Sequence, residues 1–547
     1  MTATVDRRTF VKATVVAGAG LALAFELPGC APAPAGPGSD LNAFLRVEPD
    51  GSVVVTAKHV EMGQGAYTGL ATILAEEMDA DWRKVTVVGA PADKTKYANT
   101  LMGIQLTGGS TAMANSWDQM RKAGATARAM LVAAAAAAWN VPATEITVAD
   151  GELSHAPSGR KEGFGRFAAA AGGQTPPTEV TLKERAAWKL IGQGALPRVD
   201  AAPKSSGRAV FTQDFKLPGM LTAVVAHPPR WGGTVKSFDA TRARAVPGVV
   251  DVVQVPTGVA VLATNFWAAK RGRDALKVEW YLSHAESRSS AQLWEEYRAR
   301  ARRPGVETAK RGDADRALRR AAHTLEATYT VPYLAHAAME PMNCVAQVNP
   351  GRCEMWYGAQ GHTFDQMAVA RALGITPEQV TIHTLYAGGG FGRRANPVSD
   401  YVVEAATIAK TTNGRPVKLV WTREDDTDAG FYRPMYLHTV RAGVGRDGHV
   451  SGWRHVVVGQ SVLGQTPFVG ANKPDPSSTE GVSDTAYALK DLHVQLHTTT
   501  PGIPVQWWRS VGNTHTAFVM ESMMDELAVA AGVDPVAFRL RHLPADS

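Results

Sequence analysis

The residues best suited to chemistry form a glycine-rich loop, YAGGGFGRR, at residues 386–394. Glycines carry no Cβ, so backbone N–H groups in such a loop can approach a ligand closely. Two arginines follow, and a guanidinium can bind phosphate through two parallel hydrogen bonds. The loop therefore predicts a site for phosphate or another anion. The alternative is a tight turn beside a solvated basic patch.

The flanking segments indicate how this loop is held. An apolar, alternating run, VTIHTLY, precedes it and predicts a strand, and helical apolar spacing begins near Asp400. The order is therefore strand, glycine loop and helix. A helix N-terminus adds partial positive charge, which favours anion binding.

Two earlier glycine turns have the same setting. EMGQG, residues 61–65, follows two predicted strands around an Asp50-Gly51 hairpin turn and precedes the helical run AYTGLATILAEEM. Its Gln64 amide can offer both a donor and an acceptor. TGGST, residues 107–111, opens a long alanine-rich helix with Ser110 or Thr111 as its N-cap. We expect the alanine-rich half to be buried, because it has almost no polar face.

Several site classes are excluded. The sequence contains no GxxxxGK[ST], GxSxG or HExxH motif, which weighs against a P-loop, a serine hydrolase and a zincin. The three cysteines, Cys30, Cys344 and Cys353, cannot ligate a four-thiolate iron–sulfur cluster. His336, Glu340 and Cys344 are four residues apart, but Pro341 and strand-type neighbours predict a strand end and turn there, so no metal site is expected.

Length and charge set the broad class. A chain of 547 residues is too long for one core and should form several domains. The formal net charge of +6 is spread along the chain, which does not favour nucleic-acid binding.

The N-terminus has the pattern of an export signal. Arg7 and Arg8 stand in DRRTFVK, before an apolar stretch from Ala13 to Phe25 that is too short to span a membrane as a helix. This predicts twin-arginine export of a folded protein to the periplasm, with no transmembrane span; the alternative is a chance Arg-Arg pair. Cys30, in LPGC, also matches a lipoprotein cleavage box, which leaves lipid anchoring as an alternative to plain cleavage.

The composition along the chain predicts the following organisation: a signal segment at 1–30, a Pro/Ala/Gly spacer at 31–40, a first glycine-turn segment at 41–200, a compact α+β unit at 205–282, a solvated helical connector at 283–321 and a second binding region at 322–547. The expected fold class is multidomain α+β.

The motifs together resemble a known family. EMGQG, TGGST, the compact α+β unit, HAAMEP, AGGGFGRR and QWWRSVG, in this order, are similar to the molybdopterin-binding large subunit of the isoquinoline 1-oxidoreductase type, within the xanthine oxidase and aldehyde oxidase family of molybdenum hydroxylases. The resemblance covers about Leu41 to Leu543. It implies that the compact unit is an α/β hammerhead domain and that the flanking regions form a split molybdopterin-binding region.

The resemblance also implies a cofactor and its contacts. The cofactor is a molybdopterin dinucleotide, expected in the cytosine form, whose molybdenum has no protein ligand. The residues expected to contact it are Gln64, Gly65, Thr107, Gly108, Gly109, Ser110, Gly388, Gly389, Gly390, Phe391, Gly392, Arg393 and Arg509.

Partners and chemistry follow from the same resemblance. The substrate would be an aldehyde or an aromatic N-heterocycle, and electrons would pass to a separate small subunit with 2Fe–2S clusters, with a cytochrome as a further acceptor. The general-base glutamate of the family lies in a Gly-x-Gly-Glu motif that is expected beyond Ser547, so no catalytic residue is assigned here. The chain without that segment is expected to be inactive.

Two other functions stay open at this stage. A catalytically incomplete subunit that binds cofactor without turnover would also lack the glutamate. An exported solute-binding protein would share the export signal and the basic charge balance. Bound pterin without substrate-dependent dye reduction favours the former, and absence of pterin fluorescence after denaturation favours the latter.

The export prediction can be tested by replacing Arg7 and Arg8 with lysine. Twin-arginine recognition needs the guanidinium pair, so we expect the variant to stay in the cytoplasm, as measured by cell fractionation. Replacement of the nearby Lys12 by arginine is the matched control and should leave export unchanged. Appearance of the double-lysine variant in the periplasm would contradict the prediction.

Overall fold

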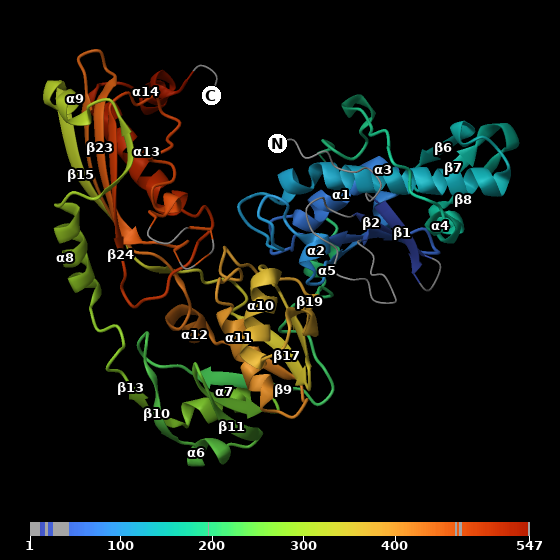
Figure 1. Ribbon diagram of the computed structural model, residues 1–547, viewed down its shortest axis with the longest axis horizontal. Coiled ribbons are helices and arrows are strands. Elements are labelled where there is room, and N and C mark those ends of the chain that lie inside the picture. Colours follow the sequence, from blue (N-terminus) through green and yellow to red (C-terminus); the bar gives the residue numbers. More distant parts are fainter. Residues whose placement is uncertain are drawn as a thin grey trace. The chain divides into compact units, whose positions relative to one another are not determined.

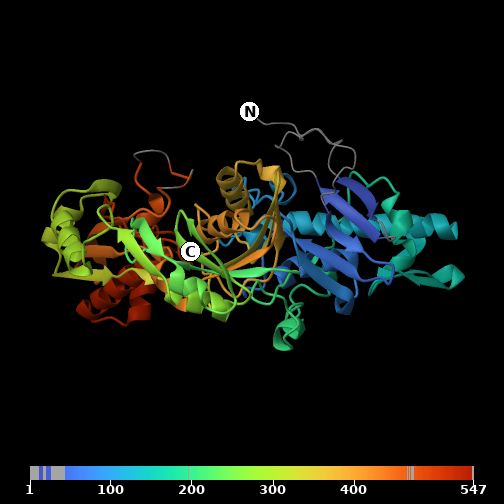
Figure 2. The ribbon, with the colours of Figure 1, turned by 90° about the horizontal axis from the view of Figure 1, so that it is seen from below.

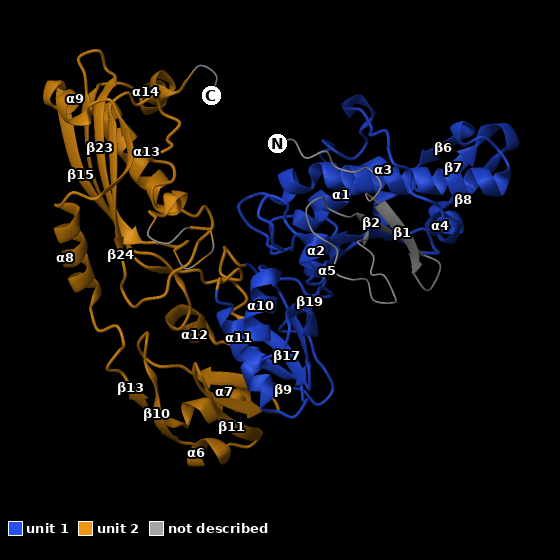
Figure 3. Ribbon diagram, in the orientation of Figure 1, with its two compact units in different colours: residues 1–221, 343–389, 398–419 blue, residues 222–342, 390–397, 420–547 orange. Residues whose placement is uncertain are grey.

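The computed structural model describes residues 11–16, 20–25, 43–194, 196–464, 466, 468–469 and 473–544 (Figure 1). The chain divides into two compact units, each built from separate stretches of sequence (Figure 3). Unit 1 comprises residues 1–221, 343–389 and 398–419, and unit 2 comprises 222–342, 390–397 and 420–547. Helices and strands occur in both units, which agrees with the predicted α+β class.

The first part of unit 1 is a five-stranded sheet. Its strands, in spatial order, are β1 (Val11–Val16), β2 (Gly20–Phe25), β3 (Ala43–Val47), β4 (Val53–Ala57) and β5 (Val85–Gly89). The β3–β4 hairpin turns at Asp50-Gly51 as predicted, with Gly51 at φ 82°. Strands β4 and β5 are parallel, and α1 (Ala66–Met78) connects them.

Strands β1 and β2 fall in the stretch that the sequence predicts to be an export signal. They pair with each other, and β2 also pairs with β3. Arg7, Arg8 and Cys30 lie outside the described residues. Export therefore stays a prediction.

The long helix α3 (Ala112–Trp139) lies beside α1 and α4 (Phe164–Gly172) over the first sheet (Figures 1 and 2). Its N-cap is Thr111, one of the two predicted residues. The expectation that its alanine-rich half is buried is wrong. Ala134 and Ala135 are buried but Ala137 and Ala138 are exposed, because alanine is small enough for either face of a packed helix.

A buried carboxylate fixes the segment that follows α4. Glu76, on α1, accepts hydrogen bonds through Oε2 from the backbone N–H groups of residues 189–191, at 2.6–3.1 Å, and through Oε1 from Lys183 Nζ at 2.9 Å. Burial by itself would raise the pKa of Glu76, but these hydrogen bonds lower it overall. The segment therefore lies against α1 and delivers residues 198–204 to the glycine turn at 61–65.

The second part of unit 1 is a helix-covered sheet. Its strands are ordered β20 (Val417–Val420), β17 (Asn343–Asn349), β18 (Arg352–Tyr357) and β19 (Val380–Thr384). Strands β18 and β19 are parallel and are connected by α10 (His362–Leu373), while α11 (Asp400–Lys410) packs on β17 and on α10. The predicted order of strand, glycine loop and helix is therefore confirmed as β19, residues 386–394 and α11.

Unit 2 begins with the segment predicted to be a compact α+β unit. It contains β9 (Leu221–Ala226), β10 (Thr234–Asp239), α6 (Thr241–Arg244), β11 (Val249–Val255), β12 (Gly258–Ala263), α7 (Phe266–Asp274) and β13 (Lys277–Tyr281). Strand β12 pairs antiparallel with both β9 and β11, and β10 pairs with β13. The hammerhead label and the predicted domain boundaries stay predictions.

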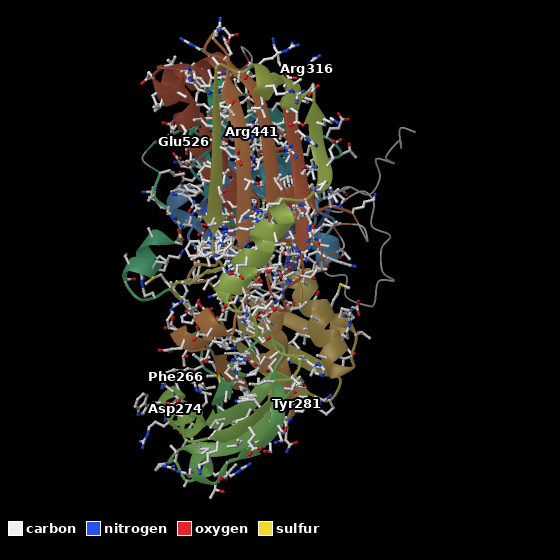
Figure 4. The ribbon with its side chains drawn as sticks, turned by 90° about the vertical axis from the view of Figure 1, so that its left-hand side faces the viewer. Phe266, Asp274, Tyr281, Arg316, Arg441 and Glu526 are labelled. Atoms are coloured by element: carbon white, nitrogen blue, oxygen red, sulfur yellow. The ribbon has the colours of Figure 1, made fainter. Side chains whose placement is uncertain are left out.

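The rest of unit 2 is built on a second five-stranded sheet. Its strands are ordered β14 (Val306–Arg311), β24 (Leu492–Thr499), β23 (Val450–Gln460), β22 (Tyr436–Val444) and β15 (His323–Val331). Val440 and Ala442 pack in one core with α13 (Asn513–Ala530) and α14 (Pro535–His542), whereas Leu437 packs in another with α8 (Ser290–Ala301). Figure 4 views this sheet from the side that carries α8.

The segment predicted to be a connector, 283–321, contains α8, β14 and α9 (Ala314–Arg320). Strand β14 is hydrogen-bonded to β24, so part of this segment belongs to the sheet. The remaining elements are α2 (Lys94–Tyr97), β6 (Ile146–Ala149), β7 (Glu152–His155), β8 (Arg160–Gly163), α5 (Ala201–Ser205), β16 (Leu334–Ala335), α12 (Arg423–Asp428) and β21 (Tyr432–Arg433). Within the described residues, every helix is too short or too polar to cross a membrane.

Helices α1 and α3 pack closely at Gly124. A Cβ built on Gly124 would lie 2.3 Å from the carbonyl oxygen of Leu74, so the backbones themselves are in contact. Gly69, on α1, differs: its Cβ would meet the flexible end of Met113 at 2.5 Å.

We expect Gly124→Ala to lower the free energy of unfolding by about 1–3 kcal/mol, because overpacking exceeds the gain in helix propensity. Gly69→Ala is the matched control and should change stability by less, since Met113 can move aside. Urea midpoints of both variants provide the measurement. Equal midpoints for the two would show that the α1–α3 contact yields easily.

Candidate functional site

In unit 1, the EMGQG turn is organised by the carboxylate of Glu61. Its Oε1 accepts from the backbone N–H groups of Gly63 at 2.7 Å and Gly65 at 3.1 Å, and its Oε2 accepts from Tyr67 at 3.2 Å. The Glu61 side chain is fully buried, and Gly65, at φ 92°, is the N-cap of α1. The N–H groups predicted to face an anion are therefore bonded to a carboxylate of the same turn.

The Gln64 side chain closes this turn from the other side. Its Nε2 donates to the carbonyl of Val60, and its Oε1 accepts from the N–H of Met62, both at 2.8 Å. Each group makes one hydrogen bond within the turn, and the amide can still donate one further hydrogen bond and accept another. Contact of Gln64 with a cofactor therefore stays a prediction.

A cluster of opposite charges surrounds Glu61. Arg198 Nη2 lies 3.2 Å from Glu61 and 2.8 Å from Asp200, and Lys204 Nζ lies 2.5 Å from Asp200. Burial favours a raised pKa for Asp200, but the hydrogen bonds from Arg198 and Lys204 lower its pKa overall. Lys204 Nζ also lies 5.0 Å from the centre of the ring of Tyr386, the first residue of the glycine loop.

Thr107 joins the separate motifs of unit 1. Its Oγ1 accepts from Val60 N–H at 3.0 Å, and its own N–H donates to the carbonyl of Gln360 at 3.0 Å. Gln360 Nε2 in turn donates a hydrogen bond to the carbonyl oxygen of Thr107 at 2.9 Å. Ala387 N–H donates to the Glu61 carbonyl at 3.3 Å. The turns at 61–65 and 107–111, Gln360 and the start of the glycine loop therefore lie together.

Gln360 carries an acceptor atom, Oε1, that receives no hydrogen bond from the described residues. Because its Nε2 faces a carbonyl, the amide orientation is fixed, and Oε1 is buried with no donor among the described residues. A ligand with N–H groups would satisfy it. Gln360 was not among the predicted site residues, and in the sequence it stands only three residues after Tyr357, the last residue of β18.

The other predicted residues of unit 1 lie at the ends of these turns. Gly109 and Ser110 are exposed and have positive φ angles of 62° and 55°, while Gly108 is half-buried. Gly388 and Gly389 follow Ala387 directly, and Gly389 has φ 93°. Gly389 is the last residue of this stretch of unit 1, and Gly390 begins the next stretch of unit 2.

In unit 2, the glycine loop is bonded to the QWWRSVG turn. Phe391 O accepts from Arg509 N–H at 2.7 Å, and Gly392 O accepts from Gln506 Nε2 at 3.1 Å. The rings of Phe391 and Trp508 are stacked with centres 6.4 Å apart. Two of the predicted segments are therefore adjacent.

The HAAMEP segment joins the same cluster. His336 Nε2 lies 3.0 Å from the carbonyl oxygen of Trp507, and its ring stacks on Trp508 at 4.6 Å. Burial lowers the pKa of His336 to about 4, so the ring is neutral at pH 7. Its Nε2 therefore donates to the carbonyl.

The predicted anion-binding arginine of the glycine loop is buried. Arg393 is 1% exposed, and its guanidinium lies over the rings of Trp421 and Phe431 at 5.6 and 5.7 Å. Arg394 is fully buried and pairs with Glu340 through Nη2 at 3.0 Å. The alternative of a solvated basic patch is therefore wrong, and both guanidinium groups contact protein. Arg509 is exposed.

Two buried bases beside Thr107 were not found from the sequence. Burial lowers the pKa of Lys58 to about 8 and that of His59 to about 4. His59 Nδ1 lies 3.5 Å from Thr107 Oγ1. Among the described residues, His, Cys, Asp and Glu side chains form no group of three or more that could hold a metal ion.

Two family models, both described as molybdopterin cofactor-binding domains, match residues 3–215 and 298–543. The chain is 33% identical to the beta subunit of isoquinoline 1-oxidoreductase of Brevundimonas diminuta, over 92% of this chain and 70% of that protein. It is 30% identical to a membrane-bound aldehyde dehydrogenase of Gluconacetobacter polyoxogenes, over 99% and 72%. It is 29% identical to one of the subunits of nicotinate dehydrogenase of Pseudomonas putida, over 92% and 43%.

Solved structures show the same fold. Quinoline 2-oxidoreductase from Pseudomonas putida 86 superposes with a TM-score of 0.53 at 19% identity, covering 64% of this chain and 50% of that one. Aldehyde oxidoreductase from Desulfovibrio gigas gives 0.53 at 19%, covering 70% and 47%. The chain thus spans about half the length of these two structures. The predicted multidomain α+β architecture is confirmed.

The contact between the glycine loop and the QWWRSVG turn can be tested at Gly392. A Cβ on Gly392, which has φ 108°, would lie 2.7 Å from the carbonyl oxygen of Trp507. We expect Gly392→Ala to destabilise the protein by about 2–4 kcal/mol through the clash and the backbone strain together.

Gly374→Ala is the control, because Gly374 also has a positive φ, 74°, but an added Cβ would meet open space. It should cost only about 1 kcal/mol. Thermal unfolding monitored by tryptophan fluorescence distinguishes the two. A Gly392 variant no less stable than the control would contradict the described contact.

Proposed function

Because the chain belongs to the family of the isoquinoline 1-oxidoreductase beta subunit, among the molybdenum hydroxylases, we propose that it is the large subunit of an exported molybdenum hydroxylase. It oxidises an aldehyde or hydroxylates an aromatic N-heterocycle with oxygen derived from water. The named relatives act on both classes: isoquinoline and nicotinate are N-heterocycles, and the Gluconacetobacter protein is an aldehyde dehydrogenase.

The single observation that carries this proposal is the meeting of the glycine turns around Thr107 and Gln360. The buried, unpaired Oε1 of Gln360 fits a cofactor that carries N–H donors, such as a pterin. Residues 107–110, 360 and 388–389 of unit 1 would hold that cofactor, and the contacts expected of Gln64, Gly65, residues 390–393 and Arg509 stay predictions. When bound, the molybdenum–pterin group supplies the two-electron oxidation chemistry.

The protein groups of the site have a positioning role. Thr107 and Gln360 exchange two hydrogen bonds and Glu61 fixes the start of α1, so these turns are held before any ligand binds. Such preorganisation lowers the entropic cost of binding and of aligning the reacting groups. His59 is neutral at pH 7 and adds no positive charge near these turns.

Electron transfer would need a second chain. Cys344 and Cys353 are buried and form no disulfide with each other, and the three thiols of this sequence are fewer than the four that a 2Fe–2S cluster needs. We infer a small 2Fe–2S partner subunit and a cytochrome as the subsequent acceptor. The cytosine dinucleotide form of the cofactor and the periplasmic location belong to the same proposal.

The decisive experiment is to purify the chain together with its small subunit and to measure molybdenum, pterin and substrate-dependent dye reduction. We expect molybdenum and pterin in equal amounts, with reduction of the dye by an aldehyde or by an N-heterocycle when a polypeptide that carries the Gly-x-Gly-Glu glutamate is added. Bound cofactor without turnover would indicate a catalytically incomplete subunit. Absence of both molybdenum and pterin would overturn the proposal.

A point variant tests the part assigned to Gln360. Gln360→Leu removes the buried acceptor, and we expect cofactor retention to fall about tenfold, because a ligand N–H left unpaired costs roughly 1–3 kcal/mol. Gln347→Leu is the matched control in the same unit: its Nε2 also donates to one backbone carbonyl, that of Gly414, at 2.8 Å. Molybdenum content per protein is the readout. Normal content in the Gln360 variant would remove this residue from the site.

A further inference from the structure

Three buried histidines in unit 2 form a continuous hydrogen-bonded chain. His455 Nε2, on β23, lies 2.8 Å from His438 Nδ1, on β22, and His438 Nε2 lies 3.0 Å from His515 Nδ1, on α13. All three side chains are at most 1% exposed. None of the three belongs to the glycine-rich turns or to the HAAMEP and QWWRSVG segments.

The direction of the hydrogen bonds in this chain is set by Trp453. Its indole Nε1–H can only donate, and it lies 3.5 Å from His455 Nδ1. Burial lowers the pKa of His455 and of His515 to about 3 and that of His438 well below its usual value, so all three rings are neutral at pH 7. Each neutral ring accepts at Nδ1 and therefore donates at Nε2. The last proton of the chain lies on His515 Nε2.

His515 Nε2 is buried and has no hydrogen-bond partner among the described residues. The ring lines a small cavity at the start of α13. The cavity has a volume of about 10 Å³, which is room for about one water-sized atom. Its lining consists of Arg433, Pro434, Tyr436, Val462, Ser477, Gln506, Trp508, Val511, Gly512, Thr514 and His515.

Arg433 brings a second unpaired donor to this cavity. It is 7% exposed, its Nη2 donates to the carbonyl of Pro332, and its Nε is buried without a partner. Within the part of the chain that the structure describes, no carboxylate forms an ion pair with Arg433. Its positive charge also favours the neutral form of His515.

The hydroxyl groups of the lining are already hydrogen-bonded. Tyr436 donates to the carbonyl of Gln460 at 2.7 Å, Ser477 to Asp475 at 2.6 Å and Thr514 to the carbonyl of Val511 at 3.0 Å. The two N–H groups of His515 and Arg433 are thus left as donors, beside apolar walls. A ligand that only accepts hydrogen bonds matches this arrangement.

We propose that this cavity binds a small inorganic monoanion of halide size, held by His515 Nε2–H and Arg433 Nε–H. An anion offsets the buried guanidinium charge, which is costly without a counter-charge. A water molecule in the cavity would leave the guanidinium charge without a counter-charge. The cavity shares Gln506, Trp508, Val511 and Gly512 with the QWWRSVG turn, but the anion proposal does not depend on cofactor binding.

Bromide, as a chloride substitute with strong anomalous scattering, provides the test. Crystals of the full chain, with its small subunit if that copurifies, are soaked in sodium bromide. We expect an anomalous peak in the cavity, within about 3.5 Å of both nitrogen atoms, as for charge-assisted N–H donors. Excess chloride should abolish the peak. A cavity that holds water without anomalous signal would overturn the proposal.

Variants connect the peak to its donors. We expect His515→Phe to lower bromide occupancy about tenfold or more, because a hydrogen bond to a charged group is lost. His497→Phe is the control: this histidine of unit 2 contacts the carbonyl of Arg303 and does not line the cavity. Unchanged occupancy in the His515 variant, or an equal loss in the control, would contradict the assignment.

A neutron structure of the deuterated wild-type protein tests the histidine chain without any substitution. Deuterium is expected on Nε2 of His455, His438 and His515. Deuterium on Nδ1 of His515 would turn its Nε2 into an acceptor and would overturn the proposal. This readout does not depend on enzyme activity or on cofactor content.

Discussion

The arrangement of unit 1 depends on one buried carboxylate, that of Glu61, which accepts hydrogen bonds from backbone N–H groups at the start of α1. Glu61 takes three backbone N–H groups that would otherwise be left unpaired inside the protein, and Arg198 balances its charge. A buried N–H group without a partner is costly, so this turn has little freedom to change shape. Through Val60 and the Glu61 carbonyl, the fixed turn sets the positions of Thr107 and Ala387. The candidate binding surface is therefore a consequence of satisfying backbone groups.

In unit 2, by contrast, side chains donate hydrogen bonds to backbone carbonyl groups. The carbonyl oxygens of Gly392 and Trp507 accept from Gln506 and His336, so the strained loop backbone is bonded on its acceptor side. Positive φ angles at Phe391, Ser510 and Val511 persist because these surroundings hold them. Arg394 and Glu340 add a buried ion pair to the same cluster. Strain in the loop and rigidity around it therefore occur together.

Local features could be predicted from the sequence, and long-range ones could not. The hairpin at Asp50-Gly51, the cap at Thr111 and the strand–loop–helix order all depend on neighbouring residues, which a sequence shows directly. The contacts of the two arginines depend on residues that are distant in the sequence. Arg393 lies over the ring of Trp421, and Arg394 pairs with Glu340, which is 54 residues before it. The use of Gln64 inside its own turn, and of Gln360 beside Thr107, likewise required the folded chain. Periodicity also gave no means of telling which alanines of α3 face solvent.

The division of the chain between the two units bears on how the protein can be synthesised and folded. Unit 1 takes its last stretch from residues 398–419, so α11 and β20 join it only after nearly all of the first 420 residues have been made. During synthesis on the ribosome, the earlier stretches of unit 1 have an incomplete core until residues 398–419 are made. Residues 222–342 and 390–397, which belong to unit 2, are synthesised in the meantime. Contacts of such large sequence separation fold slowly and leave apolar surface open to aggregation. Neither unit exists as one continuous polypeptide, so cutting the chain at a single position cannot release one unit intact, and chaperones are expected to matter for its yield.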